Sequence, residues 1–327
     1  MIDTFVQLGN RLKLFSERRD IIANAITQNA WFTEEEILRS VEAIRLTMLQ
    51  RPLLEAWMKE YTPAPSPKRV ALIMAGNIPL VGFFDLMCVL LSGHECHYKQ
   101  SSKDSVLMHY VVGELRSIRP DIAIYDYSST EHYDMVIATG GDEANRYFAE
   151  HFATTRHLLR GSRHSIAVLD GTESEEELAA LANDITAYSG LGCRSVSMIF
   201  YPQGTTLKLA SRPASCKKLE QSLRMRKALL MMQSTPYVDC NGYIATHATS
   251  FPSSLGEVTL HGYVALSDVE AWLKKHKEDI QCVVSHLDTL NEYLPFGRTI
   301  PFGRAQYPAL TDYADGIDTM AFLTAQY

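Results

Sequence analysis

The sequence predicts an α/β protein with a parallel sheet. From residue 70 onward, short apolar runs typical of buried strands alternate with longer runs that have helical periodicity. Strands that alternate with helices favour a parallel sheet that the helices cover. The 327 residues, 46% hydrophobic and 21% charged, have the composition of an ordinary globular protein with one large or two medium domains.

The expected elements follow in order along the chain. Residues 1–61 are expected to be helical, with a capping box at Thr33 and Glu36, and a proline-rich linker follows at 62–68. The Met-rich residues 229–232 are expected in the core. The strand-like runs are 70–74, 94–100, 121–127, 134–140, 165–170, 195–202, 258–266 and 280–286. The helical runs between them are 79–93, 103–118, 142–152, 174–189, 214–233 and 268–279.

Composition and charge disfavour several classes of protein. The net charge of −7 and the absence of a long basic run make nucleic acid a poor partner. The first residues lack a signal-peptide pattern, and the apolar stretch 78–93 carries Asp85 and is too short to span a bilayer. The six cysteines form no CxxC pair, and His94 and His97 would point to opposite faces of a strand. We therefore expect no metal site and a cytoplasmic location with reduced thiols.

Small, polar or cationic residues follow three of the predicted strands. Ligands of open α/β sheets bind beyond the carboxyl ends of the strands, and backbone N–H groups at a helix N-terminus attract anions. This arrangement suits a phosphate-bearing cofactor, although GxGxxG is absent and each turn taken alone fits plain turn geometry better than ligand binding. The residues are 75–79 after the first strand, Lys99, Ser101, Ser102 and Lys103 at the end of the second strand and after it, and Thr139, Gly140 and Gly141 at the end of the fourth strand and after it.

Two further residues allow a structural and a chemical interpretation. Asn77 precedes Pro79 and is either a turn-forming residue or an amide donor to a developing oxyanion. Cys193 lies in GLGCRS, between a helical run and a strand-like run, and is either a small buried hydrophobe or a nucleophile. Arg194 beside it would favour the thiolate.

The order of five motifs resembles a known superfamily. AGNIP, YKQSS, IATGG, GLGC and PFG occur in the order found in aldehyde dehydrogenases, and most resemble the acyl-CoA reductase family that includes the reductase subunit of bacterial bioluminescence, the LuxC-like family. The resemblance covers about residues 65–327 and implies an aldehyde-dehydrogenase-like fold. The expected segments are an N-terminal helical segment (1–61), a Rossmann-type cofactor domain (62–160) completed by C-terminal residues, an α/β catalytic domain (161–290) and a bridging segment (291–327).

The resemblance also implies roles for individual residues. Cys193 would take the acyl group as a thioester, and the Asn77 amide and the Cys193 N–H would hold the thioester oxygen. Phe302, in the second of two PFGR sequences, would lie near the active site or a subunit contact. The cofactor would contact Lys99, Ser101, Ser102, Lys103, Thr139, Gly140 and Gly141.

Departures from the superfamily pattern sharpen the expected chemistry. Leu159 occupies the position of a Glu that activates water in hydrolytic members, which favours reduction over hydrolysis. Ser102 and Lys103 replace a Glu that binds ribose hydroxyls in NAD-preferring members, which favours NADPH, with NADH as the alternative. The chain is short between Cys193 and PFGR, so the usual oligomer is in doubt.

The sequence hypothesis is NADPH-dependent reduction of an acyl thioester to an aldehyde through a Cys193 acyl-enzyme. The substrate would be an acyl-CoA or an acyl-carrier thioester, and an acyl-donating partner protein and a homo-oligomer are compatible with this hypothesis. Two alternatives stay open. One is an acyl-phosphate reductase of the same superfamily, and the other is a non-catalytic nucleotide-binding protein in which the cysteine is structural.

Overall fold

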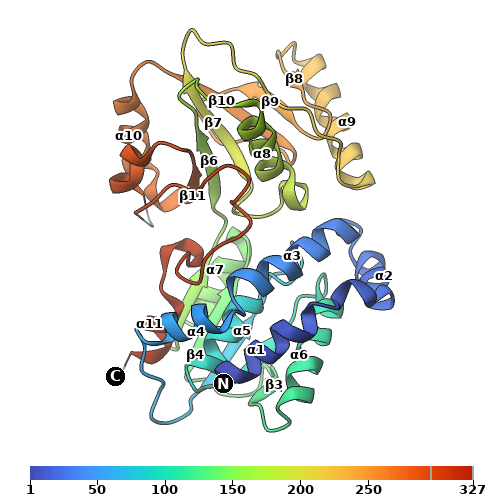
Figure 1. Cartoon of the computed structure of the whole chain (residues 1–327), viewed down its shortest axis with the longest axis vertical. Helices are drawn as coiled ribbons and strands as arrows, with labels where there is room; N and C mark the ends of the chain where they lie inside the picture. Colours follow the sequence, from blue (N-terminus) through green and yellow to red (C-terminus); the bar gives the residue numbers. More distant parts are fainter. Residues whose placement is uncertain (295–296, 326–327) are drawn as a thin grey trace. The chain divides into compact units, whose positions relative to one another are not determined.

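The chain forms two compact units in the computed structural model, which describes residues 1–294 and 297–325 (Figure 1). Unit 1 comprises Met1–Ser162 and the C-terminal residues from Tyr307, and unit 2 comprises Arg163–Gln306. The four segments expected from the sequence stay a prediction, because the two units are defined only by which residues pack together. Within the described residues, no helix has both the length and the apolar character needed to cross a membrane.

Unit 1 contains a five-stranded sheet in which all neighbouring strands are parallel, as predicted. The strand order is β3-β2-β1-β4-β5, so the order reverses between β1 and β4. Ligands of sheets with this topology bind outside the carboxyl ends of the strands at the reversal. The strands are β1 (Arg69–Ile73), β2 (Glu95–Lys99), β3 (Ile124–Asp126), β4 (Met135–Thr139) and β5 (Arg156–Arg160).

The N-terminal helices belong to the core of unit 1. Their apolar side chains join those of β1, α5 and α6 in one cluster, and α3 begins at the predicted capping box, where the Thr33 side chain accepts the Glu36 N–H. Asp85, on the apolar helix α5, is buried and pairs with the buried Arg160 of β5. The helices are α1 (Ile2–Leu12), α2 (Arg19–Gln28), α3 (Glu34–Thr47), α4 (Arg51–Met58), α5 (Phe83–Leu91), α6 (Ser105–Ile118), α7 (Asp142–His151) and α11 (Thr319–Thr324).

Unit 2 contains a six-stranded sheet with the order β11-β6-β7-β10-β9-β8, parallel except for the β8–β9 pair. Its strands alternate side chains between two apolar clusters, one completed by α8 and the other by α10. These helices lie on opposite faces of the sheet (Figure 1). The elements are β6 (His164–Val168), α8 (Glu175–Thr186), β7 (Val196–Pro202), α9 (Lys217–Met232), β8 (Val238–Asp239), β9 (Ile244–His247), β10 (Glu257–Tyr263), α10 (Leu266–Lys275) and β11 (Ile280–Val284).

The pattern analysis missed some elements and misplaced one group of side chains. Strands β5, β8 and β9 and helix α11 were not expected, since each is short and lacks a long apolar run. The core prediction for residues 229–232 was wrong for three of the four. Leu230 is buried, whereas Leu229, Met231 and Met232 are 47%, 69% and 83% exposed. Only one face of α9 packs on the rest of unit 2, and three of these four residues lie off that face.

Candidate active site

Cys193 lies in the turn between α8 and β7 of unit 2, where the backbone adopts an unusual conformation. Tyr188, Ser189 and Gly190 have φ values of 52°, 57° and 74°, so three consecutive residues are left-handed. Glycine adopts this region readily, but Tyr188 and Ser189 are buried non-glycine residues whose left-handed φ costs ~1–3 kcal/mol each. Such strain persists only where the surroundings impose it, and it concentrates at functional sites.

Hydrogen bonds fix the backbone on both sides of Cys193. The buried Ser165 of β6 donates its hydroxyl to the Cys193 carbonyl at 2.8 Å. The Ser195 N–H donates to the Gly192 carbonyl at 2.9 Å, and the Ser195 hydroxyl donates to the Ala187 carbonyl at 3.1 Å. The turn is therefore held to the sheet and to the end of α8, which gives the cysteine a defined position.

The second PFGR sequence, residues 301–304, is tied to the same region. The buried Asp184 of α8 accepts the N–H groups of Gly303 and Ala305, at 2.6 and 3.1 Å. Arg194 is buried and donates its Nε–H to the Ala305 carbonyl at 2.6 Å. Arg194 thus links the Cys193 turn to this segment, and its predicted effect on the thiol stays a prediction.

Phe302 lines a cavity of about 400 Å³ within unit 2. Its ring meets the His286 ring edge-on, with centroids 5.8 Å apart. The predicted role of Phe302 at the active site or a subunit contact stays a prediction. Residues 295 and 296 of the first PFGR sequence lie outside the described residues.

The six thiols differ strongly in exposure. Cys88, Cys96, Cys240 and Cys282 are buried, and burial raises the pKa of the first three, which keeps them in the less nucleophilic protonated form. Cys193 and Cys216 are partly exposed. Cys193 is therefore one of two cysteines that a reagent can reach, and it is the one that lies in the strained turn.

In unit 1, two predicted site loops lie directly against each other. Asn77 is half-buried in the loop after β1, and Ser101 belongs to the loop after the neighbouring strand β2. A Cβ atom on Gly76 would lie 2.5 Å from both Cβ and Oγ of Ser101, so only glycine allows this approach. The structure thus brings Asn77 close to the Ser101 loop, as expected for loops that follow adjacent parallel strands.

Asp104 joins these two loops and was missed by the sequence analysis. It precedes α6, is 1% exposed, and its Oδ2 accepts the Leu80 N–H at 2.8 Å. Its Oδ1 has no hydrogen-bond partner among the described residues. Burial raises the pKa of this carboxyl to about 8. No sequence signal distinguishes Asp104 from an ordinary helix N-cap.

The cationic candidates stand exposed at the carboxyl edge of the unit 1 sheet. The Lys99 ammonium group lies 5.8 Å from the centre of the Tyr127 ring, and Ser102 and Lys103 are exposed in the turn before α6. The Ser101 hydroxyl oxygen accepts the Lys103 N–H at 3.3 Å. These side chains are available to a ligand at this edge.

Thr139 is the last residue of β4, and Gly140 and Gly141 follow it, on the other side of the strand reversal from the β2 loop. Gly140 donates its N–H to the Arg160 carbonyl at 3.1 Å. The next helix, α7, begins with Asp142 and Glu143, whose carboxylates already complement its dipole. We therefore expect a bound phosphate to depend on the lysines near β2 more than on this helix.

Comparison with known proteins decides the family. The LuxC acyl-CoA reductase family model matches residues 22–229, well over half of the chain. The chain belongs to the LuxC acyl-CoA reductase family. The match begins earlier than the motifs indicated, within the N-terminal helices, and it ends before the PFGR sequences. It includes Asn77 and Cys193.

Among curated LuxC-type relatives, the chain is 26% identical to the long-chain acyl-protein thioester reductase of Aliivibrio fischeri, over 68% of this chain and 48% of the relative. It is 23% identical to the enzyme of the same name from Photorhabdus laumondii, over 75% of this chain and 55% of the relative. The chain thus spans about half the length of these curated relatives.

Solved structures confirm the predicted aldehyde-dehydrogenase-like fold. A putative aldehyde dehydrogenase from Burkholderia cenocepacia matches with a TM-score of 0.65 and 11% identity, over 90% of this chain and 76% of that one. Betaine aldehyde dehydrogenase from Staphylococcus aureus, solved with NAD⁺, matches with a TM-score of 0.63 and 14% identity, over 90% of this chain and 72% of that one.

Proposed function

We propose that this LuxC-family chain reduces an acyl thioester to an aldehyde through an acyl-enzyme at Cys193, with NADPH as the reductant. The Cys193 thiolate attacks the acyl carbon, a new C–S bond forms, and the donor leaves as a thiolate that takes up a proton. A bound nicotinamide cofactor would supply the hydride that converts the acyl group into an aldehyde. The C–S bond to Cys193 then breaks and restores the thiolate.

The position of Cys193 carries this proposal. A nucleophile must be accessible and held in one place, and Cys193 is partly exposed in a turn fixed by Ser165, Ser195 and the strained residues before it. The named relatives are acyl-protein thioester reductases, which supports an acyl-carrier thioester or acyl-CoA as substrate. Asn77 is proposed to donate its side-chain amide to the oxyanion.

The carboxyl edge of the unit 1 sheet fits a nicotinamide dinucleotide. The strand order reverses there, Gly76 permits close backbone packing, and Lys99 and Lys103 offer exposed positive charge. A structural neighbour was solved with NAD⁺, which supports a cofactor of this class. NADPH is proposed over NADH because Ser102 and Lys103 would accept a 2′-phosphate. Ser101, Thr139, Gly140 and Gly141 are proposed to contact the rest of the cofactor.

Leu159 supports reduction over hydrolysis. It lies on β5, half-buried against an apolar cluster, so this side chain offers no base to activate water. We therefore expect the acyl-enzyme to persist when NADPH is absent. His157 and His164 are the two histidines nearest to Leu159 in the sequence, and each makes a contact with another group. His157 Nδ1 lies 2.8 Å from the Thr155 carbonyl, and the His164 ring stacks on Phe251.

The test is intact-mass analysis of the protein mixed with acyl-CoA or an acylated carrier in the absence of NADPH. We expect one acyl group per chain on wild type and on Cys216→Ala, and none on Cys193→Ala. Cys216 is the matched control, because it is the other partly exposed thiol. NADPH should then discharge the adduct as aldehyde. Acylation that survives in Cys193→Ala, or rapid release of free acid from wild type, would contradict the proposal.

Formation of the adduct from an acyl phosphate but not from a thioester would instead identify an acyl-phosphate reductase. No adduct with either donor, together with NADPH binding, would identify a nucleotide-binding protein without this catalysis.

A further inference from the structure

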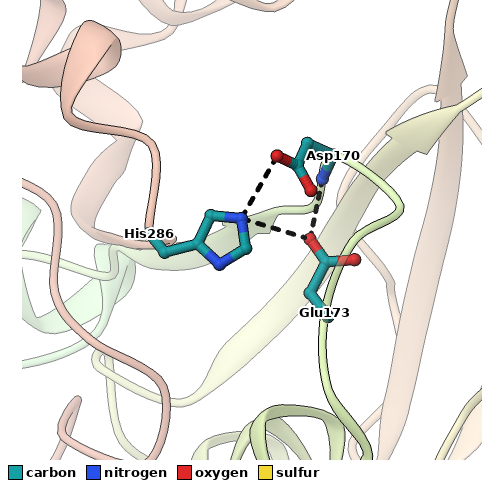
Figure 2. A group of neighbouring side chains, drawn as sticks. All are labelled: Asp170, Glu173 and His286. Atoms are coloured by element: carbon teal, nitrogen blue, oxygen red, sulfur yellow. Dashed lines mark hydrogen bonds and ion pairs between the residues drawn. The ribbon is translucent and has the colours of Figure 1, made fainter.

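A second group of reactive side chains lies at the carboxyl ends of β6 and β11 in unit 2. Asp170 follows β6, Glu173 lies in the turn that leads to α8, and His286 follows β11. Strands β6 and β11 are adjacent and parallel, so their carboxyl ends meet at one edge of the sheet. Figure 2 shows the imidazole pointing toward both carboxylates.

The distances suit a small divalent cation. His286 Nε2 lies 3.3 Å from Asp170 Oδ2 and 4.0 Å from Glu173 Oε1, and the ligand atoms all lie within 4.8 Å of one another. Zinc bonds to nitrogen and oxygen are ~2.0–2.2 Å, which places two ligand atoms of a tetrahedral site about 3.4 Å apart. The His286–Asp170 pair already has this spacing, and Glu173 Oε1 lies about 0.6 Å farther than this spacing from His286 Nε2.

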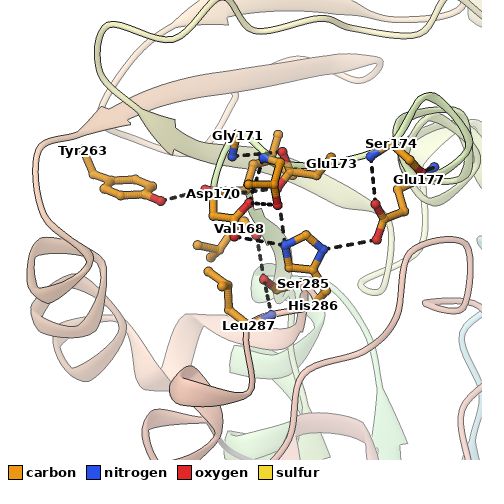
Figure 3. Close-up of polar contacts among 12 residues, drawn as sticks. Val168, Asp170, Gly171, Glu173, Ser174, Glu177, Tyr263, Ser285, His286 and Leu287 are labelled. Atoms are coloured by element: carbon orange, nitrogen blue, oxygen red, sulfur yellow. Dashed lines mark hydrogen bonds and ion pairs between the residues drawn. The ribbon is translucent and has the colours of Figure 1, made fainter.

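Surrounding hydrogen bonds orient all three side chains (Figure 3). Glu177 Oε1 lies 3.1 Å from His286 Nδ1, so a hydrogen on Nδ1 leaves the Nε2 lone pair facing the carboxylates. Glu173 accepts the N–H groups of Asp170 and Gly171, at 2.7 and 3.1 Å. Asp170 uses Oδ1 to accept from Thr172, which leaves Oδ2 toward the imidazole. Partners of this kind fix ligands at metal sites.

His286 also lines the cavity of about 400 Å³, together with Glu177, Ser285 and Phe302. Asp170 and Glu173 are not among the residues that line this cavity, so the proposed cation lies beside it and not in it. One imidazole nitrogen and two carboxylates are ligands of the kind that zinc binds in proteins.

We propose that Asp170, Glu173 and His286 form a Zn²⁺ site at the carboxyl edge of the unit 2 sheet. This site goes beyond the proposed reductase activity and differs from the sequence expectation of no metal. The cation would join the turn before α8 to the segment that leads to the second PFGR sequence.

The test is equilibrium dialysis of the tag-free protein against Zn²⁺, with bound metal measured by elemental analysis. We expect one equivalent per chain, and His286→Gln should weaken binding by at least tenfold. The matched control is His276→Gln. His276 is similarly exposed and pairs with one carboxylate, Asp279, at 2.9 Å, so its loss should leave zinc binding unchanged. Asp170→Asn keeps Oδ1 and serves as the second ligand variant.

The visible absorption spectrum of the Co²⁺-substituted protein reports the type and geometry of the metal ligands. Strong visible absorption, with no sulfur-to-metal charge-transfer band in the near ultraviolet, is expected from a tetrahedral site with nitrogen and oxygen ligands. Circular dichroism without metal should show both ligand variants folded. The proposal is overturned if wild type binds no zinc, if His286→Gln and Asp170→Asn both bind like wild type, or if the cobalt spectrum shows thiolate ligation. The acyl-transfer assay is independent of all these outcomes.

Discussion

The carboxyl edge of the unit 1 sheet and the amino edge of the unit 2 sheet, where Cys193 lies, are built in different ways. In unit 1, the edge consists of loops that pack through small residues, such as Gly76 against Ser101, with exposed lysines beside them. In unit 2, buried polar side chains such as Ser165 and Asp184 hold the backbone around Cys193. The unit 1 loops suit an extended ligand that is bound by many weak contacts along its length. The region around Cys193 suits a single reacting atom, the Cys193 sulfur, that must be held in place.

This difference predicts different kinetic consequences. Changes at the unit 1 loops should alter mainly cofactor affinity and selectivity. Changes around the Cys193 turn should alter mainly kcat, because a small displacement of a nucleophile costs more than a small displacement in an extended binding site. Asn77 is the exception on the unit 1 side, since its proposed contact is made to the reacting oxygen.

The largest effect is expected for Cys193→Ala, which should abolish acyl transfer and reduction while NADPH binding stays nearly intact. The thiol forms the bond to the acyl group, whereas the proposed cofactor loops belong to unit 1. Turnover with acyl-CoA and fluorescence titration with NADPH measure the two properties separately. If the variant retains more than a small fraction of turnover, Cys193 is not the nucleophile.

Asn77→Ala should lower kcat by ~10²-fold, the usual loss when one oxyanion donor is removed. NADPH affinity and melting temperature should change little, because Asn77 lies in a loop and not in a regular element. Steady-state kinetics and thermal unfolding check both points. An unchanged kcat would leave Asn77 with a structural role only.

Asp184→Asn should lower kcat and also destabilise the protein by about 1–3 kcal/mol. An amide has one oxygen acceptor, so it cannot accept both the Gly303 and the Ala305 N–H as the two carboxylate oxygens do. Asp268→Asn is the control, because the exposed Asp268 accepts the N–H groups of Val264 and Ala265 with one oxygen, Oδ2, so an amide oxygen can keep both bonds. Equal losses of kcat in the two variants would show that the bonds from Asp184 to the PFGR segment have no particular importance for catalysis.

Ser102→Glu should shift preference from NADPH toward NADH by roughly fivefold or more. Two unit charges about 4 Å apart in water repel by about 1 kcal/mol, and a 2′-phosphate carries more than one charge. Thr130→Glu, which adds the same charge at another exposed loop position of unit 1, should leave the preference unchanged. The ratio of kcat/KM for the two cofactors is the measurement. No change in this ratio would show that the loop does not contact the 2′ position.

Asp104→Asn is expected to have the smallest effect on turnover but a defined pH dependence of stability. Burial raises the pKa of this carboxyl to about 8, above the unfolded value near 4. The carboxyl therefore stays protonated to a higher pH in the folded state than in the unfolded state. The wild type therefore loses stability as pH rises from about 4 to 8. The asparagine variant resembles the protonated acid and should lack this loss.

Melting temperatures at pH 5 and pH 8 test this prediction, and the advantage of Asp104→Asn should be larger at pH 8. Asp121→Asn is the control, since the exposed Asp121 pairs with Arg119, which lowers its pKa. An advantage of Asp104→Asn that is equal at both pH values would mean that Asp104 is ionised in the folded protein.

Sequence patterns predicted the features that depend on local periodicity. The apolar runs at 70–74, 134–140 and 165–170 correspond to β1, β4 and β6, and the capping residue Thr33 begins α3 as expected. The strand order and the approach of Gly76 to Ser101 could not be predicted from periodicity, because they depend on pairing between distant segments. The same limit applies to the site. The motifs identified Cys193 and Asn77 as candidates. Asp184, Ser165 and the His286 cluster could not be identified in this way, because their contacts are made to residues more than twenty positions away.

Unit 1 is discontinuous in the sequence, and this constrains how the protein folds during synthesis. Several side chains of the first segment find their partners only after unit 2 has been made. Trp57 donates its indole N–H to the Tyr313 hydroxyl at 2.9 Å, and Arg160 donates to the Thr319 hydroxyl at 2.6 Å. His94 Nε2 lies 2.9 Å from the Leu323 carbonyl. Domains generally fold as they leave the ribosome, from the N-terminus. Unit 2 can therefore complete its sheet before the C-terminal residues of unit 1 have been made, so unit 1 reaches its final packing last although it contains the N-terminus.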